Sequence, residues 1–324
     1  MLSRPVLLAL PTTPATPAPP PPAVRSADVV IGALGGVGSA GSRFVLQRRP
    51  GGLVLFGELG DGGGALRHAL RKADARPVLM IDQEGGAVRR VRTLGPSPAR
   101  MLRQRPVVAT RREFRAVGKA LHRLGVDVDL APVADVDAGG ATGFRSFGST
   151  PASAGVRVAA AIRGLRAGGV AGCVKHFPGL GTVRTNTDFG VAVDRRSRAA
   201  VTRDLAAFRP GIAAGVRCVM VSSVVVPALC DRPAVLCPDT YRRLRRMGFR
   251  GAIVTDSLDA DALRRYGSPG TLAVRALQAG ADSVLVTSPW STLQAIDAIG
   301  RATRTGRLDR ARLRAGAARL RALR

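Results

Sequence analysis

Residues 171–179, Ala-Gly-Cys-Val-Lys-His-Phe-Pro-Gly, join a short apolar run to a polar loop that contains a proline. From residue 28 onward the same order repeats: a β-branched apolar run, a polar or Gly-rich stretch, and a helical segment. Fully apolar strands that alternate with amphipathic helices are typical of a parallel sheet covered by helices. Eight such units in 324 residues predict an α/β fold, a (β/α)8 TIM-like barrel. The runs are Val29–Leu34, Leu53–Phe56, Val78–Ile81, Val126–Leu130, Ala171–Val174, Cys218–Val221, Ala252–Val254 and Ser283–Val286.

The main alternative is a doubly wound open sheet, which usually carries a GxGxxG loop after its first strand. Residues 32–41, GALGGVGSAG, contain glycines but lack that firm spacing. We therefore expect one barrel domain over residues 26–324. Its helices are expected near 109–124, 152–168, 198–214, 238–247 and 269–280.

Residues 1–25 differ from the rest of the chain. MLSRPVLLAL holds one arginine and an apolar stretch broken by Pro5, and the proline-rich PTTPATPAPPPPA follows as a stiff tether. This extension is either a signal-like segment with a linker or an unstructured N-terminus. A signal-like segment favours a secreted or envelope-associated protein over a cytoplasmic one.

The chain is strongly basic, with a formal net charge of +28. Only Lys72, Lys119 and Lys175 are lysines, and the many arginines are spread over the whole chain. This distribution indicates a compositional bias, which predicts salt-dependent association with polyanions but no specific nucleic-acid partner. No apolar run reaches the ~18 to 20 residues of a membrane span, so we expect no transmembrane segment.

Four cysteines lack CxxC spacing, which excludes a zinc ribbon, and they are too few for a disulfide-built scaffold. Cys173 and Cys218 lie in predicted strands, where we expect free, buried thiols. Cys230 and Cys237 flank a short loop and could form a bridge outside the cell. No metal or organic cofactor is implied.

Polar residues follow several predicted strands, where a (β/α)8 barrel carries its reacting groups. Asp82 follows the third run, Lys175 and His176 the fifth, and Asp256 the seventh. Each has a structural alternative: Asp256 could cap a helix, and Arg145 in the loop after the fourth run could be one solvated arginine among many. A lysine that closes a buried strand, however, needs anionic or hydroxyl partners. Together these carboxylates and cations suit a neutral, polyhydroxylated substrate.

Four motifs occur in a characteristic order: IDQEGG at 81–86, RSFG at 145–148, KHFPG at 175–179 and VTDSL at 254–258. In this order and at these separations they closely resemble glycoside hydrolase family 3, in particular its single-domain bacterial β-N-acetylglucosaminidase (β-hexosaminidase) branch. The similarity covers roughly residues 45–290.

The resemblance implies a retaining exo-hydrolase that forms a covalent glycosyl-enzyme. Asp256 aligns with the catalytic nucleophile, and a retaining mechanism places its proton donor ~5 to 5.5 Å away when both groups are carboxylic. The residues that align with binders of the terminal sugar's hydroxyls are Asp82, Arg90, Arg145, Lys175 and His176.

The loop after KHFPG departs from the resemblance. This branch has Asp-Ser-His, with histidine as acid/base, where this chain has Asn186-Thr187-Asp188. Asp188 could serve as a carboxylic acid with a raised pKa; alternatively, the loop has lost its acid and the protein is slow or inactive. Ala87 and Ser257 replace an arginine and an aspartate that are usual in the family, which leaves substrate detail open.

We therefore expect a retaining exo-β-N-acetylglucosaminidase, a monomer, acting on peptidoglycan-type fragments. The alternatives are a β-glucosidase or other exo-glycosidase on the same barrel, a non-catalytic sugar-binding homologue, and polyanion binding through residues 301–324. For that segment we expect a helix that packs on the barrel with its arginines in solvent. Its packing residues would be Leu308, Leu313, Leu320 and Leu323.

Overall fold

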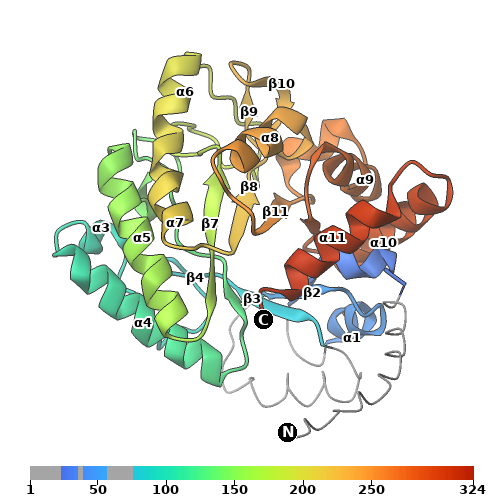
Figure 1. The fold of residues 1–324 in the computed structure, drawn as a ribbon, viewed down its shortest axis with the longest axis horizontal. Coiled ribbons are helices and arrows are strands. Elements are labelled where there is room, and N and C mark those ends of the chain that lie inside the picture. Colours follow the sequence, from blue (N-terminus) through green and yellow to red (C-terminus); the bar gives the residue numbers. More distant parts are fainter. Residues whose placement is uncertain (1–22, 36–38, 57–75) are drawn as a thin grey trace, which may run out of the picture.

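The computed structural model describes residues 23–35, 39–56 and 76–324, and among them eight parallel strands close into a barrel (Figure 1). Neighbouring strands follow chain order, and the last pairs with the first. This confirms the predicted fold class, and every predicted run overlaps a barrel strand. The strands are β1 (Val30–Leu34), β2 (Gly52–Leu55), β3 (Val78–Ile81), β6 (Val128–Asp129), β7 (Ala171–Phe177), β8 (Cys218–Val221), β11 (Ala252–Ser257) and β12 (Ser283–Leu285). β7 and β11 are longer than their runs, so Lys175, His176 and Asp256, which were expected to follow the strands, lie in their last residues.

Helices surround the barrel (Figure 1). Several begin at a serine or threonine whose side chain accepts a bond from a first-turn amide, followed at once by proline, as at Thr150-Pro151 and Ser268-Pro269. The predicted segments match helices, except that 198–214 is two short helices joined by a 3-10 turn. The helices are α1 (Ala40–Gln47), α3 (Ala99–Leu102), α4 (Val107–Arg123), α5 (Pro151–Ala167), α6 (Arg198–Asp204), α7 (Arg209–Ala213), α8 (Pro238–Arg246), α9 (Pro269–Ala279), α10 (Pro289–Arg304) and α11 (Arg310–Arg321).

Two antiparallel hairpins extend the carboxyl end of the barrel: β4 (Gln83–Gly85) with β5 (Val88–Arg89), and β9 (Val225–Val226) with β10 (Cys230–Pro233). The first requires glycine, because Gly85 has φ +97° and a Cβ there would lie 2.5 Å from the carbonyl oxygen of Pro96. This tight turn fixes the segment that follows β3.

The barrel interior is an apolar cluster to which every barrel strand contributes. Leu320 of α11 and Leu323, two residues beyond that helix, belong to the same cluster. With Leu308 and Leu313 they are at most 3% exposed, which confirms that the C-terminal leucines pack against the barrel.

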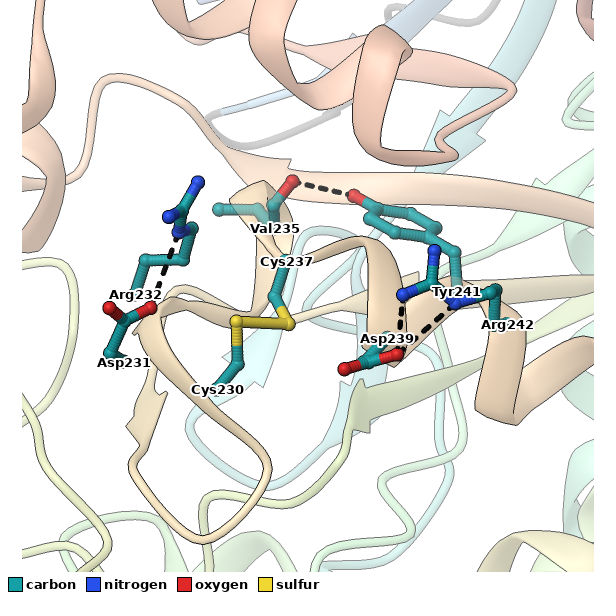
Figure 2. Close-up of a disulfide and its surroundings, with 8 residues drawn as sticks. All are labelled: Cys230, Asp231, Arg232, Val235, Cys237, Asp239, Tyr241 and Arg242. Atoms are coloured by element: carbon teal, nitrogen blue, oxygen red, sulfur yellow. Dashed lines mark hydrogen bonds and ion pairs between the residues drawn. A yellow bond between two sulfur atoms is a disulfide. The ribbon is translucent and has the colours of Figure 1, made fainter.

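The cysteines form two disulfides. The expectation that Cys173 and Cys218 are free thiols is wrong, because they are register partners on β7 and β8, with Cα atoms 4.3 Å apart. The second bridge, anticipated as a possibility, joins Cys230 of β10 to Cys237 before α8 (Figure 2). Nearby, the Tyr241 hydroxyl donates to the Val235 carbonyl at 2.8 Å.

The proline-rich extension expected over residues 1–25 lies, up to residue 22, outside the described residues. Among the residues that are described, no helix combines the length and the apolar character that crossing a membrane requires.

Candidate active site

A pocket of about 420 Å³ opens at the carboxyl end of the barrel strands. Four members of the interior cluster, Val54, Leu130, Met220 and Leu285, also line it, so the packed interior closes it from below. The structure brings together every site residue predicted from the sequence. These pocket-lining residues are Asp82, Arg90, Arg145, Lys175, His176, Asp188 and Asp256.

Lys175 is the most buried cation of the pocket, at 2% exposure. Its Nζ lies 2.6 Å from Asp82 Oδ1 and 2.6 Å from Glu84 Oε1. Burial alone would lower its pKa, but the two carboxylates raise that pKa above its ordinary value. The anionic partners expected for a lysine at the end of a buried strand are therefore present.

Glu84 was not singled out from the sequence, although it is one of three glutamates and lies within IDQEGG. Arg145 donates two hydrogen bonds to Glu84, from Nη2 to Oε1 at 2.6 Å and from Nε to Oε2 at 2.8 Å. Burial opposes ionisation, yet Arg145 and Lys175 hold the pKa of Glu84 well below its usual range. Arg145 is thus an ordered group of the pocket rather than one of the many solvated arginines.

His176 is oriented by Asp135, a second residue that sequence reasoning missed. Asp135 Oδ2 lies 2.8 Å from His176 Nδ1, and Oδ1 accepts the amides of His176 and Leu180 at 3.2 and 2.9 Å. Arg145 Nη2 lies 3.3 Å from His176 Nε2. Because a guanidinium only donates, this contact is a hydrogen bond only when Nε2 accepts, with the imidazole proton on Nδ1, facing Asp135.

Asp129 lies at the end of β6, buried beside the Lys175 network. Its Oδ1 accepts the Gln83 amide at 3.0 Å, whereas Oδ2 has no hydrogen-bond partner in the described part of the chain. Burial raises its pKa to about 8, so this carboxyl is largely protonated at neutral pH. Gln83 in turn donates to the carbonyls of Leu94 and Gly95, which holds the β4–β5 hairpin in place.

Asp256 is half-buried near the end of β11, and its Oδ1 accepts the Ser257 amide at 2.8 Å. It is not a helix cap, because the next helical turn begins at Asp261 and follows Ala260. Burial raises its pKa, as does nearby Asp188; the opposing effect comes mainly from His176.

Asp188 lies on the loop after β7, exposed at the pocket. Its amide donates to Asn186 Oδ1 at 3.1 Å. The carbonyls of Thr187 and Asp188 accept the amides of Ala262 and Asp261, both at 3.2 Å, from the segment that follows β11. The structure therefore docks the loop that carries Asp188 against the segment just beyond Asp256.

Asp259, also missed from the sequence, connects the ends of the last two barrel strands. Its Oδ2 accepts the amide of Thr287 at 2.5 Å and the Thr287 hydroxyl at 3.1 Å, and Oδ1 accepts the Ser291 hydroxyl. Ser257 stands where the family resemblance leads one to expect an aspartate. Its Oγ accepts a hydrogen bond from the Asp259 amide at 3.2 Å. This cluster positions the backbone beside Asp256.

Across residues 23–35, 39–56 and 76–324, no group of three or more His, Cys, Asp or Glu side chains is arranged to hold a metal ion. Carboxylates, an imidazole and cations line the pocket.

The sequence matches a known protein family over most of its length. The family model described as "Glycosyl hydrolase family 3 N terminal domain" matches residues 47–323. The β-hexosaminidase of Stenotrophomonas maltophilia is 34% identical over 259 residues, which cover 75% of this chain and 77% of the relative.

Solved structures of similar proteins superpose on this chain. A glycoside hydrolase family 3 β-N-acetylglucosaminidase from Paenibacillus superposes with a TM-score of 0.85 and 29% identity over 92% of this chain. The match spans 61% of that longer protein. The β-N-acetylhexosaminidase of Beutenbergia cavernae superposes with a TM-score of 0.82 and 26% identity, covering 92% of this chain and 96% of the other.

Proposed function

Because the chain belongs to glycosyl hydrolase family 3 and is a glycoside hydrolase, we propose that it is a retaining exo-β-N-acetylglucosaminidase. Its substrates would be peptidoglycan-type fragments that end in N-acetylglucosamine. We assign the activity to residues 26–324. The observation that carries the proposal is a pair of carboxylates in one pocket, which the packed barrel interior closes from below. Asp256 lies on β11, and Asp188 lies on the loop that docks beside it.

In the first step, an ionised Asp256 oxygen attacks C1 of the terminal sugar. The bond from C1 to the glycosidic oxygen breaks, and Asp188 gives its proton to that oxygen, which leaves as a hydroxyl. The sugar is then esterified to Asp256.

In the second step, water attacks C1 of the ester. Asp188, now a carboxylate, takes the proton of the water while the bond from C1 to Asp256 breaks. Two inversions at C1 retain the β configuration, and both aspartates return to their starting states.

The fixed charges suit the hydroxyls of the terminal sugar. Asp82 and Lys175 offer an acceptor and a donor held 2.6 Å apart, and Arg145 and His176 lie beside them. Arg90 contributes a further cation, 3.5 Å from Asp82. Because each group is held by its neighbours before substrate arrives, little ordering is left for the binding step.

The test is hydrolysis of 4-nitrophenyl N-acetyl-β-glucosaminide, with the first-formed anomer identified by NMR. We expect the β-anomer, and at least a several-hundred-fold lower turnover in Asp256→Asn, which keeps the shape of the side chain but not its charge. A first-formed α-anomer would refute the retaining mechanism. Faster hydrolysis of the glucoside that lacks the acetamido group would favour a β-glucosidase, and no hydrolysis of either would favour a non-catalytic sugar-binding protein.

A further inference from the structure

Among the described residues, the lysine and arginine side chains that line the pocket differ in what holds them. Lys175 and Arg145 are each fixed by contacts of 2.6 Å to carboxylates. Arg90 has no such clamp. Its ion pair with Asp82 spans 3.5 Å, and its buried Nε has no hydrogen-bond partner within residues 23–35, 39–56 and 76–324. A long side chain of this kind needs another restraint if it is to meet a substrate in one orientation.

An aromatic ring lies against Arg90. The guanidinium carbon of Arg90 lies over the Phe56 ring, 5.0 Å from its centroid, which is within the ~6 Å over which an aromatic face attracts a cation. Both side chains line the pocket. Because the ring offers no lone pair, this contact leaves the N–H donors of the guanidinium for other acceptors.

The two residues come from different elements of the barrel rim. Phe56 directly follows β2, its amide donates to the Leu34 carbonyl at 2.9 Å, and its side chain packs against the apolar cluster of the barrel interior. Arg90 directly follows β5, and its amide donates to Gln83 Oε1 at 3.0 Å. The ring is therefore anchored to the barrel, beside a side chain that lacks a short clamp of its own.

We propose that Phe56 is a positioning residue for the reaction: by cation–π attraction it holds the Arg90 guanidinium at the pocket wall, with its N–H donors available to the bound sugar. The inference rests on the proposed sugar-binding role of Arg90. Phe56 acts through Arg90 and through no contact of its own with the reacting atoms. Its contribution is pre-organisation, because an arginine that is held before substrate arrives loses little side-chain freedom on binding.

The test is a double-mutant cycle on kcat/KM for 4-nitrophenyl N-acetyl-β-glucosaminide. The variants are Phe56→Leu, Arg90→Met and the two together. Leucine and methionine keep apolar packing, but each removes one half of the cation–π pair. Phe56→Tyr keeps the ring. Phe44→Leu is the matched control, because Arg48 lies 4.8 Å over the Phe44 ring, on α1 and its C-cap and outside the set that lines the pocket.

We expect kcat/KM to fall at least about fivefold in Phe56→Leu and at least about tenfold in Arg90→Met. In the Arg90→Met background, Phe56→Leu should lower kcat/KM by less than about twofold further, since the partner is already gone. Phe56→Tyr and Phe44→Leu should stay within roughly twofold of the unaltered protein. The inference would be overturned by a Phe56→Leu loss that is equally large without Arg90, by a loss that Phe56→Tyr shares, or by an unchanged kcat/KM in either single variant.

The fate of this inference can be separated from that of the proposed function. If the unaltered protein hydrolysed no glycoside, the proposed function would fall, and the same cycle would be measured on the Kd for N-acetylglucosamine by titration calorimetry. The inference predicts the same pattern there, with the effect of Phe56→Leu confined to proteins that retain Arg90. If the unaltered protein did not bind N-acetylglucosamine either, both the proposed function and the inference would fall.

Discussion

Replacing Glu84 with glutamine should destabilise the protein more than any ordinary surface change. Glu84 accepts three short contacts from two cations, Arg145 and Lys175, and its side chain is 6% exposed. Glutamine keeps the shape but removes the charge and turns an amide donor toward a cation. Breaking a buried ion pair from one side costs about 3 to 5 kcal/mol, because the remaining charges stay buried. At ~2 °C per kcal/mol for a chain of this size, we expect Tm to fall by about 6 to 10 °C at pH 7.

The loss should depend on pH with a definite sign. The folded-state pKa of Glu84 is depressed, so the stability that Glu84 contributes is present above its unfolded pKa of ~4.3 and is lost as pH falls toward the folded value. The Tm difference between the unaltered protein and Glu84→Gln should therefore be constant above about pH 5.5 and shrink below about pH 4.5. Differential scanning calorimetry and urea unfolding across this range would measure it.

Glu113→Gln is the matched control. Glu113 also binds an arginine, at 2.8 Å, but Arg105 and Glu113 are 41% and 19% exposed, so solvent screens this pair more than the Glu84 network, and a screened pair contributes ~0 to 1 kcal/mol. Glu113 also accepts the Ser97 amide at 2.7 Å, a hydrogen bond that the amide oxygen of glutamine can keep. If Glu84→Gln lowered Tm no more than Glu113→Gln, or by the same amount at every pH, the buried network would not be a source of stability.

Three further predictions concern activity. Lys175→Ala should lower kcat/KM at least about a hundredfold. The control Lys119→Ala, at an exposed position on α4, should leave kcat/KM unchanged. Equal kcat/KM values in the two variants would assign Lys175 a structural role only. Asp188→Ala should strongly lower turnover of natural disaccharides but leave the glycosylation of the enzyme by dinitrophenyl glycosides nearly unchanged, because that leaving group needs no proton. Added azide should partly restore the deglycosylation step. Equal loss on both substrates and no rescue by azide would exclude Asp188 as the acid/base. Since the pKa of Asp256 is raised, the acid limb of kcat/KM should lie above the ordinary aspartate value of ~3.9, and a limb at or below that value would contradict the assignment.

The barrel could be predicted because its strands are apolar along their whole length, which sets them apart from the amphipathic helices between them. The site could be located because parallel strands bring their carboxyl ends to one rim, so polar residues such as Asp82 and Asp256 had to converge. Both signals are local in the sequence and depend on no particular register.

What could not be predicted depends on pairings between distant residues. Arg145 and Glu84 are 61 positions apart and His176 and Asp135 are 41 apart, so no local pattern links them. The Cys173–Cys218 bridge follows from the register between β7 and β8, which apolar runs leave unspecified. Glu84 could have been suspected only because glutamate is rare in this chain.

One tension in the pocket concerns which aspartate holds the proton. The proposed retaining mechanism needs Asp256 ionised and a proton on Asp188, yet Asp256 is the more buried of the two and Asp188 is exposed. Burial favours the neutral form of a carboxyl and raises the pKa of Asp256, which biases this aspartate against the ionised state that attack on C1 requires. His176 and Lys175 reduce that bias at Asp256.

A bound disaccharide would remove the rest of the bias. A leaving sugar placed over Asp188 would exclude water from the site of proton transfer. The terminal sugar's hydroxyls would meanwhile engage the carboxylates that surround Lys175, leaving more of its positive potential for Asp256. On this argument the substrate itself completes the electrostatic arrangement that the chemistry requires, so an enzyme without a sugar in the leaving-group position would depend on a leaving group that needs no proton.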